Sequence, residues 1–236
     1  HALGLGLILF FWLWPMLYLL WRLIAVDWWQ VLAHTALYQA AFTSLSLAFA
    51  SACLTVLMVV LFVPITLKNK CSALTLLPMM TLVFAPMVLI IGLLVWVVRF
   101  QYPFVFSMLM ILMFNALMAL PFAYQWMKPN LLQIQQQYQR NIHCLRLPLF
   151  SQLRWVYIPL LKKPLGLIWI FSLVLALGDV GVILLLNNDD LLTMPLLIYQ
   201  RLGNHQLDLA LVTAVLLAGV SIIAFYIQGI RLIDNF

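Results

Sequence analysis

Six long apolar stretches constrain this chain more than any other feature of its sequence. Each is long enough to form an α-helix of ~20 residues, the length that crosses ~30 Å of hydrocarbon. We predict six membrane-spanning helices, over residues 2–26, 35–66, 72–98, 105–127, 164–187 and 207–230. The expected fold class is therefore an all-α, polytopic membrane protein.

The composition excludes other classes of protein. Only 8% of the residues are charged, and glutamate is absent, whereas a soluble domain carries roughly 25% charged residues. The apolar runs are continuous, unlike the alternating pattern of an outer-membrane barrel. The first run is too long for a signal peptide and has no small-residue cleavage pattern after it. We therefore assign residues 1–34 to a first transmembrane helix with its outer loop, and residues 35–233 to a transmembrane domain.

Basic residues are concentrated in one connector. Six of the twelve lysines and arginines lie between spans four and five, with no acidic residue among them: Lys128, Arg140, Arg146, Arg154, Lys162 and Lys163. Basic loops stay in the cytoplasm, so we expect this connector and both ends of the segment to face the cytoplasm of a bacterial inner membrane. The confinement of the charges to one connector argues against a nucleic-acid partner.

The same connector has an apolar stripe with the period of a helix. The stripe consists of Leu131, Ile134, Tyr138, Ile142 and Leu145, at spacings of three and four residues. We predict that Pro148 ends this helix, and that a second short helix begins at Ser151 as its N-cap and ends before Pro159. Such a connector either rests on the lipid surface or offers its polar face to a soluble partner.

The connector also contains a run of residues that resembles a known family motif. The run Arg140-Asn141-Ile142-x3-Arg146, followed thirteen residues later by Pro159, resembles the EAA loop of binding-protein-dependent ABC importer permeases. That loop reads E-A-A-x3-G and closes on a hydrophobic-x-L-P ending. Here Arg140 stands in place of the glutamate and Arg146 in place of the glycine, while the tail 156–159 fits. In the family this loop, here residues 129–163, is the coupling helix that sits in a cleft of the ATPase.

Flanking blocks narrow the resemblance to one branch of the family. The blocks 115–123, 161–165, 178–182 and 188–203 are similar to the C-terminal half of permeases for thiamine and thiamine phosphates. The resemblance implies a type I ABC permease fold and ATP-driven import of thiamine or its phosphates. It also implies ATPase coupling through Tyr138, Arg140, Asn141, Ile142, Leu145, Arg146 and Pro159.

The resemblance further implies the partners of this chain. They are a cytoplasmic ATP-binding cassette ATPase dimer, a periplasmic substrate-binding protein, membrane lipid and a second six-helix permease half. That second half is expected in the same polypeptide, since the chain begins at His1 instead of Met. No cofactor is expected on this chain, because ATP and Mg²⁺ would be bound by the ATPase. The alternatives are a permease for ferric iron or another small solute, and a secondary transporter or channel.

Asp179 is the one acidic residue well inside a predicted span. A charge at that depth faces protein or a water-filled path. It either makes a structural hydrogen bond to a neighbouring helix or lines the path of a cationic substrate. Gly178 and Gly181 would allow close helix approach or a local break, and Asn115 is a plausible partner. We assign these four residues to the translocation path of the substrate.

The sequence shows no catalytic or metal-binding motif. A Walker A loop, G-x-S-x-G, H-E-x-x-H and C-x-x-C are all absent. The three cysteines are far apart, and the four histidines lack metal-ligand spacing. We therefore expect no catalytic residue and no metal ligand in this chain.

Overall fold

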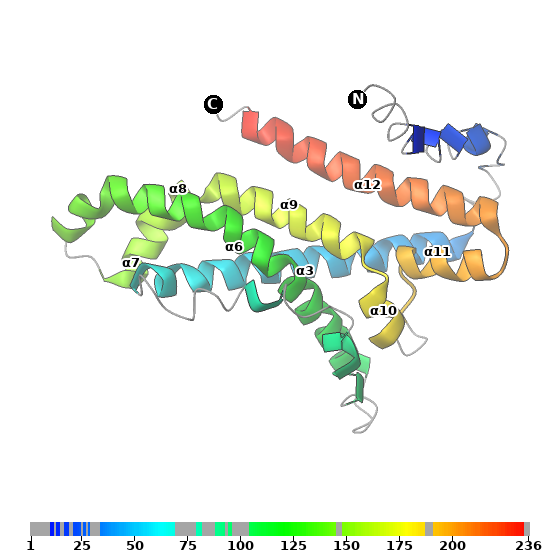
Figure 1. The fold of residues 1–236 in the computed structure, drawn as a ribbon, viewed down its shortest axis with the longest axis horizontal. Helices are drawn as coiled ribbons and strands as arrows, with labels where there is room; N and C mark the ends of the chain where they lie inside the picture. Colours follow the sequence, from blue (N-terminus) through cyan, green and yellow to red (C-terminus); the bar gives the residue numbers. More distant parts are fainter. Residues whose placement is uncertain are drawn as a thin grey trace.

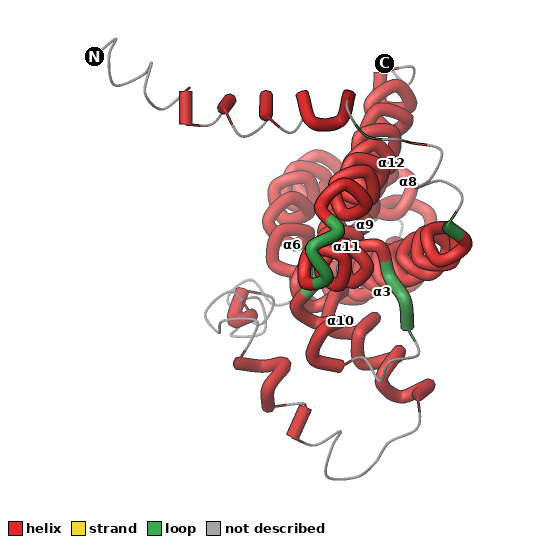
Figure 2. The backbone as a smooth tube through the Cα atoms, turned by 90° about the vertical axis from the view of Figure 1, so that its right-hand side faces the viewer, coloured by secondary structure: helices red, strands yellow, loops and turns green. Residues whose placement is uncertain are grey.

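The computed structural model describes residues 34–68, 104–144, 148–186 and 191–233, with short stretches between residues 10 and 28 and between 79 and 95. Within these ranges the chain is helical and holds no strand, as the smooth trace in Figure 2 shows. The prediction of an all-α polytopic membrane protein is confirmed.

Among the residues that the structure describes, three helices are long and apolar enough to cross a membrane. They are α3 (Thr35–Lys68), α6 (Phe104–Cys144) and α12 (Leu207–Ile233). They match the predicted spans 35–66, 105–127 and 207–230. A further span is possible if the bent pair Leu153–Leu160 and Lys162–Gly178 crosses together. Most of the predicted spans 2–26 and 72–98 lie outside the described residues.

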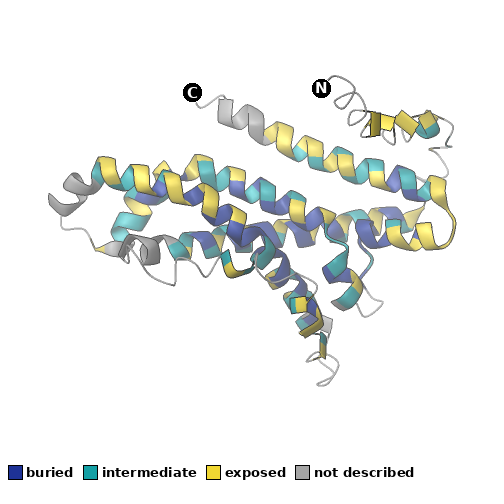
Figure 3. Cartoon of the chain, viewed as in Figure 1, coloured by how far each residue is buried: buried dark blue, intermediate teal, exposed yellow. Residues whose placement is uncertain are grey.

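Helix α3 packs against both α6 and α9 (Lys162–Gly178). Small side chains permit the close approach: Ala48 and Ala52 are buried against Leu173, Ala176 and Leu177 of α9. In the membrane such packing replaces the hydrophobic effect as the force that holds helices together. Figure 3 shows the buried residues on the facing sides of these helices, while α12 exposes much of its surface.

Two small polar residues of α3 are also buried. Ser51 and Thr55 are buried, and their hydroxyls donate to the carbonyls of Ala48 and Ser51 one turn earlier. This bonding satisfies the hydroxyls within their own helix.

Helix α6 continues far beyond the predicted fourth span. Its 41 residues correspond to about 60 Å at 1.5 Å per residue, roughly twice the hydrocarbon thickness. The helix continues through Pro121 and Pro129. We predicted the first connector helix as a separate element. It is instead the end of α6. Figure 1 shows this end of α6 beside α7 and α8, away from α10 and α11.

The rest of the connector also differs from the prediction. It consists of α7 (Leu149–Gln152), the π-helical turn η2 (Leu153–Tyr157) and α8 (Ile158–Leu160). Ser151 lies inside α7 and is not an N-cap, and Pro159 lies in the first turn of α8 and does not end a helix. Proline suits the first turn, because the N–H that it lacks has no partner there. The chain bends at Leu161, and α9 leaves at 66°.

The fifth predicted span, 164–187, is broken in the structure. Helix α9 ends at Gly178, Asp179 takes an extended conformation, and a short helix α10 (Gly181–Leu186) follows. The side chain of Asp179 explains the break, because its Oδ1 accepts the backbone N–H of Gly181 at 2.9 Å and of Val182 at 3.4 Å. This is the bonding of a helix N-cap. Helix α10 then turns away from α9 to pack on α6 (Figure 1).

Candidate functional site

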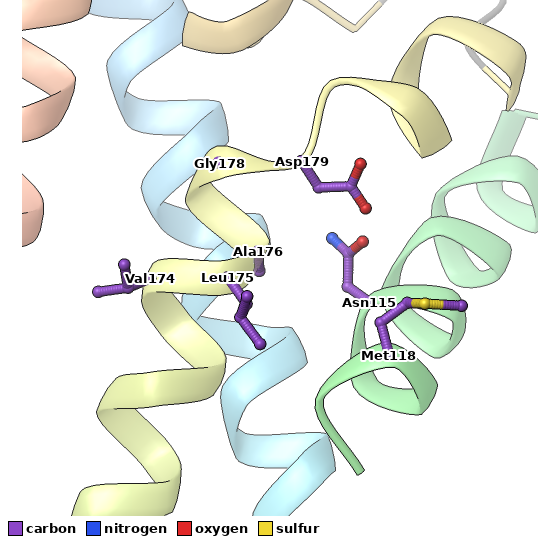
Figure 4. Close-up of a pocket in the computed structure, with 7 residues that line it drawn as sticks. All are labelled: Asn115, Met118, Val174, Leu175, Ala176, Gly178 and Asp179. Atoms are coloured by element: carbon purple, nitrogen blue, oxygen red, sulfur yellow. The ribbon is translucent and has the colours of Figure 1, made fainter. Parts of the chain in front are cut away.

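A cavity of about 330 Å³ opens where α9 ends beside α6. Figure 4 shows that the amide of Asn115, from α6, and the carboxylate of Asp179 point toward each other across it. The cavity is lined by Asn115, Met118, Val174, Leu175, Ala176, Gly178 and Asp179. It therefore combines an apolar wall with two polar groups.

Each polar group of the cavity offers a hydrogen-bond acceptor, and the amide NH2 of Asn115 is also a donor. Asn115 is only 5% exposed, and its Oδ1 has no hydrogen-bond partner within the part of the chain that the structure describes. An ionised Asp179 carboxylate can only accept hydrogen bonds. None of the lining residues is basic. The cavity thus has a negative charge and an unsatisfied acceptor, with no counter-charge in its lining.

The structure brings together three of the four predicted path residues. Asn115, Gly178 and Asp179 line the cavity, while Gly181 lies outside the lining and donates its N–H to Asp179. A Cβ at Gly178 would meet nothing within 4 Å, so close helix approach is not the reason for glycine at this position. Gly178 instead stands at the end of α9, where the predicted local break occurs.

Four lining residues were missed by the sequence analysis. Met118, Val174, Leu175 and Ala176 are apolar residues in apolar helices, so their type carries no signal. Helical spacing could have found three of them. Met118 is three positions after Asn115, and Val174 and Leu175 are four and three positions before Gly178, which places each on the same helix face as the polar or glycine residue.

The connector forms a second feature of interest. The start of its apolar stripe is packed inside the protein: Leu131 is 4% exposed, and Ile134 and Tyr138 pack on the same cluster. That cluster joins α3, α6, η2 and α9 through Val59, Leu120, Ala123, Met127, Leu131, Tyr157, Leu161 and Ile168. The glutamines 133, 136 and 137 are exposed. The first three residues of the stripe therefore hold this part of the connector to the helices, and the three glutamines face outward.

The predicted coupling residues fall into three groups. Tyr138 is half-buried on the cluster just described, and Pro159 is exposed in α8. Arg140, Asn141 and Ile142 belong to the last turns of α6, where the structure describes the backbone alone. Leu145 and Arg146 lie outside the described residues. Beside Pro159, the surface of η2 exposes Trp155 with the Arg154 guanidinium 5.8 Å from its ring centre.

The opposite end of the bundle contains α11 (Met194–Gly203), which α3 holds in place. The hydroxyl of Ser44 accepts the backbone N–H of Met194 at 2.7 Å, and the hydroxyl of Thr43 donates to the carbonyl of Leu192. Arg201 of α11 is 6% exposed and donates to the Leu209 carbonyl and to Thr213. Burial lowers the pKa of the Arg201 guanidinium. Nothing around Arg201 in the sequence indicated that this arginine is buried.

Together, these features define the class of the protein. It is a multi-pass helical membrane protein with a cavity between α6 and the end of α9, and with a long connector packed at one end. No protein-family model matches the chain.

Comparison with curated proteins identifies relatives of this chain. Over 203 residues, 83% of this chain, it is 30% identical to the thiamine transport system permease proteins of Brucella abortus (strain 2308) and Brucella suis biovar 1 (strain 1330). Over 103 residues, 44% of this chain, it is 36% identical to the thiamine transport system permease protein of Escherichia coli (strain K12). The chain is a homologue of these permeases. The matches cover 37% of the length of the Brucella proteins and 19% of the Escherichia coli protein.

Proposed function

We propose that this chain is a transmembrane permease part of an ATP-driven importer, and that its connector docks a cytoplasmic ATPase. One observation carries the coupling role. Leu131, Ile134 and Tyr138 of the apolar stripe pack against α3, η2 and α9, while glutamines 133, 136 and 137 remain exposed. A helix that rested on lipid would present its apolar side to the membrane. A helix that docks a protein presents a polar face from a fixed position.

Helix α6 provides a direct mechanical link in this proposal. It runs unbroken from Asn115 at the cavity to Leu131 at the connector, a distance of about 24 Å along the helix axis. When two ATPase subunits close, they would draw the connectors together. The buried cluster around Leu131 and Tyr157 would transmit that motion to α3 and α9, whose end forms the cavity. The path would then change from inward-open to outward-open.

The proposed substrate is thiamine or its phosphates, which is what the names of the relatives say of those proteins. Asn115, Gly178, Asp179 and Gly181 remain the proposed path residues. A permease for ferric iron or another small solute is the alternative within the family. A secondary transporter is less favoured, because coupling to an ion gradient uses several intramembrane ionisable residues, and the cavity lining holds one.

The remaining parts of the assembly follow from the same proposal. A substrate-binding protein would deliver the solute on the outside, and a second six-helix half would complete the path. The location would be the bacterial inner membrane. The basic connector and both ends of the segment would lie in the cytoplasm, following the positive-inside rule.

Site-specific cross-linking tests the docking role. Gln136 is exposed on the connector, and Asn204 is exposed at the end of α11. With a cysteine at each position in a cysteine-free background, a maleimide photo-cross-linker at position 136 should capture the ATPase. The matched position 204 should not. If positions 133, 136 and 137 all fail to capture the ATPase in an assembled transporter, the connector is not the docking element.

A further inference from the structure

The polar groups of the cavity beside Asp179 are needed neither for the packing of the helices nor for the proposed coupling to an ATPase. Asn115 Oδ1 is buried and aimed into the cavity without a partner among the described residues, and the Asp179 carboxylate faces it (Figure 4). The amide N–H groups of Asn115 can donate to the carboxylate, but Asn115 Oδ1 and the carboxylate are both acceptors and cannot satisfy each other. An unsatisfied buried acceptor costs free energy, so an arrangement of this kind favours a donor placed between the two groups.

We propose that this cavity is a binding site for a small organic cation that carries N–H or O–H donors. This inference rests on the proposed function, within which the cavity would be a binding step on the path. Asp179 supplies the charge that attracts the cation, and Asn115 Oδ1 supplies the acceptor that orients it. Asp179 Oδ1 is held by the N–H groups of Gly181 and Val182, which fixes the carboxylate at the cavity.

The size and walls of the cavity restrict the ligand. A volume of about 330 Å³ lies near the lower end of the ~300–1,000 Å³ typical of small-molecule sites. The side chains of Met118, Val174 and Leu175 form an apolar wall, and the flexible, polarisable thioether of Met118 suits a flat ring. The site thus fits a compact cation with an apolar body.

The small number of oxygen atoms in the cavity lining favours an organic cation over a metal ion. The lining offers one carboxylate and one amide oxygen from side chains. Hard cations such as Ca²⁺ take six to eight oxygen ligands. An organic cation needs far fewer contacts, since a single charge and one or two hydrogen bonds fix its orientation. We therefore infer an organic cation in preference to a metal.

Charged thiol reagents test the site without reference to transport. Met118→Cys, made in the transporter with Cys53, Cys71 and Cys144 changed to Ser, places one thiol in the cavity lining. A trimethylammonium methanethiosulfonate should react faster than a sulfonate one. Asp179→Asn should lower this rate ratio roughly tenfold, the effect of one charge over several ångströms at a partly hydrated site. The matched change Asp208→Asn, at an exposed aspartate, should leave the ratio unchanged.

Binding of radiolabelled thiamine tests whether Asn115 Oδ1 accepts a hydrogen bond from the ligand. Thiamine carries a cationic ring and an exocyclic amine, and Asn115→Ala should weaken its binding to the assembled transporter about tenfold, the effect of one hydrogen bond to a charged ligand. Asn204→Ala, an exposed control, should leave binding unchanged. Equal reactivity toward the two reagents in the parent, or unchanged thiamine binding in Asn115→Ala, would overturn the cavity proposal. Failure of the unmodified transporter to import thiamine would instead overturn the proposed substrate, while a retained cation preference would still support the cavity.

Discussion

Two adjacent leucines of α6 allow the packing of the connector to be tested with one chemical change. Leu131 is 4% exposed and belongs to the cluster that joins α3, α6, η2 and α9, whereas Leu132 is 47% exposed. Leu131→Ala removes side-chain atoms from a closed cluster and leaves a cavity. Leu132→Ala removes the same atoms from a surface.

The expected magnitudes differ strongly. A buried Leu→Ala change costs about 2–5 kcal/mol, while surface changes stay within about 0.5 kcal/mol. In a chain of this size each kcal/mol shifts the melting temperature by roughly 2–4 °C. We expect the apparent Tm of Leu131→Ala to fall by roughly 5–15 °C. For Leu132→Ala the expected fall is no more than about 2 °C.

The assay is thermal unfolding of the purified protein in one detergent, followed by the loss of monodisperse protein. ATP hydrolysis and transport are then compared below the melting temperature of both variants. Leu131→Ala should retain ATPase binding and lose transport per ATP hydrolysed, because the link from connector to cavity is loosened. Equal melting temperatures for the two variants would refute the packing argument.

Three further changes probe the other contacts, each measured by the same thermal unfolding. Asp179→Ala should lower stability by about 1 kcal/mol through loss of the cap on α10, while Asp179→Asn, which keeps a capping side chain, should stay close to the parent; equal losses would contradict the cap. Ser44→Ala should cost about 1–3 kcal/mol, because the Met194 N–H loses its acceptor in a buried position, and an unchanged Tm would show that this bond does not stabilise α11. Gly178→Ala should leave stability within about 0.5 kcal/mol of the parent, since its Cβ meets nothing within 4 Å, and a large loss would contradict that geometry.

The sequence predicted the helices best where hydropathy alone decides them. Three of the predicted spans lie in α3, α6 and α12, although α6 continues well past the predicted end, because ~20 apolar residues have one stable arrangement in a membrane. The apolar stripe from Leu131 was also recognisable, because helical spacing is visible in the sequence. Its partner surface was not, since Tyr157 and Ile168 are apolar residues without any distinguishing pattern.

The errors arose where one side chain decides the backbone. The break after Gly178 depends on Asp179 bonding two N–H groups of α10, and hydropathy averages over such a residue. The position at which α6 ends likewise depends on tertiary packing. The fourth span was predicted to end at residue 127, but the helix continues because the connector packs on Tyr157 and its neighbours. For the candidate site, Asn115 and Asp179 were found as isolated polar residues, while the apolar wall needed the structure.

Transport by the reconstituted complex tests the central claim most directly. The transporter containing this chain, with its ATPase and binding protein, is placed in proteoliposomes, and radiolabelled thiamine is supplied on the side of the binding protein. ATP on the opposite side should drive thiamine accumulation against its gradient, and a non-hydrolysable analogue should not. Accumulation that needs no ATP and follows a proton or sodium gradient would contradict an ATP-driven permease.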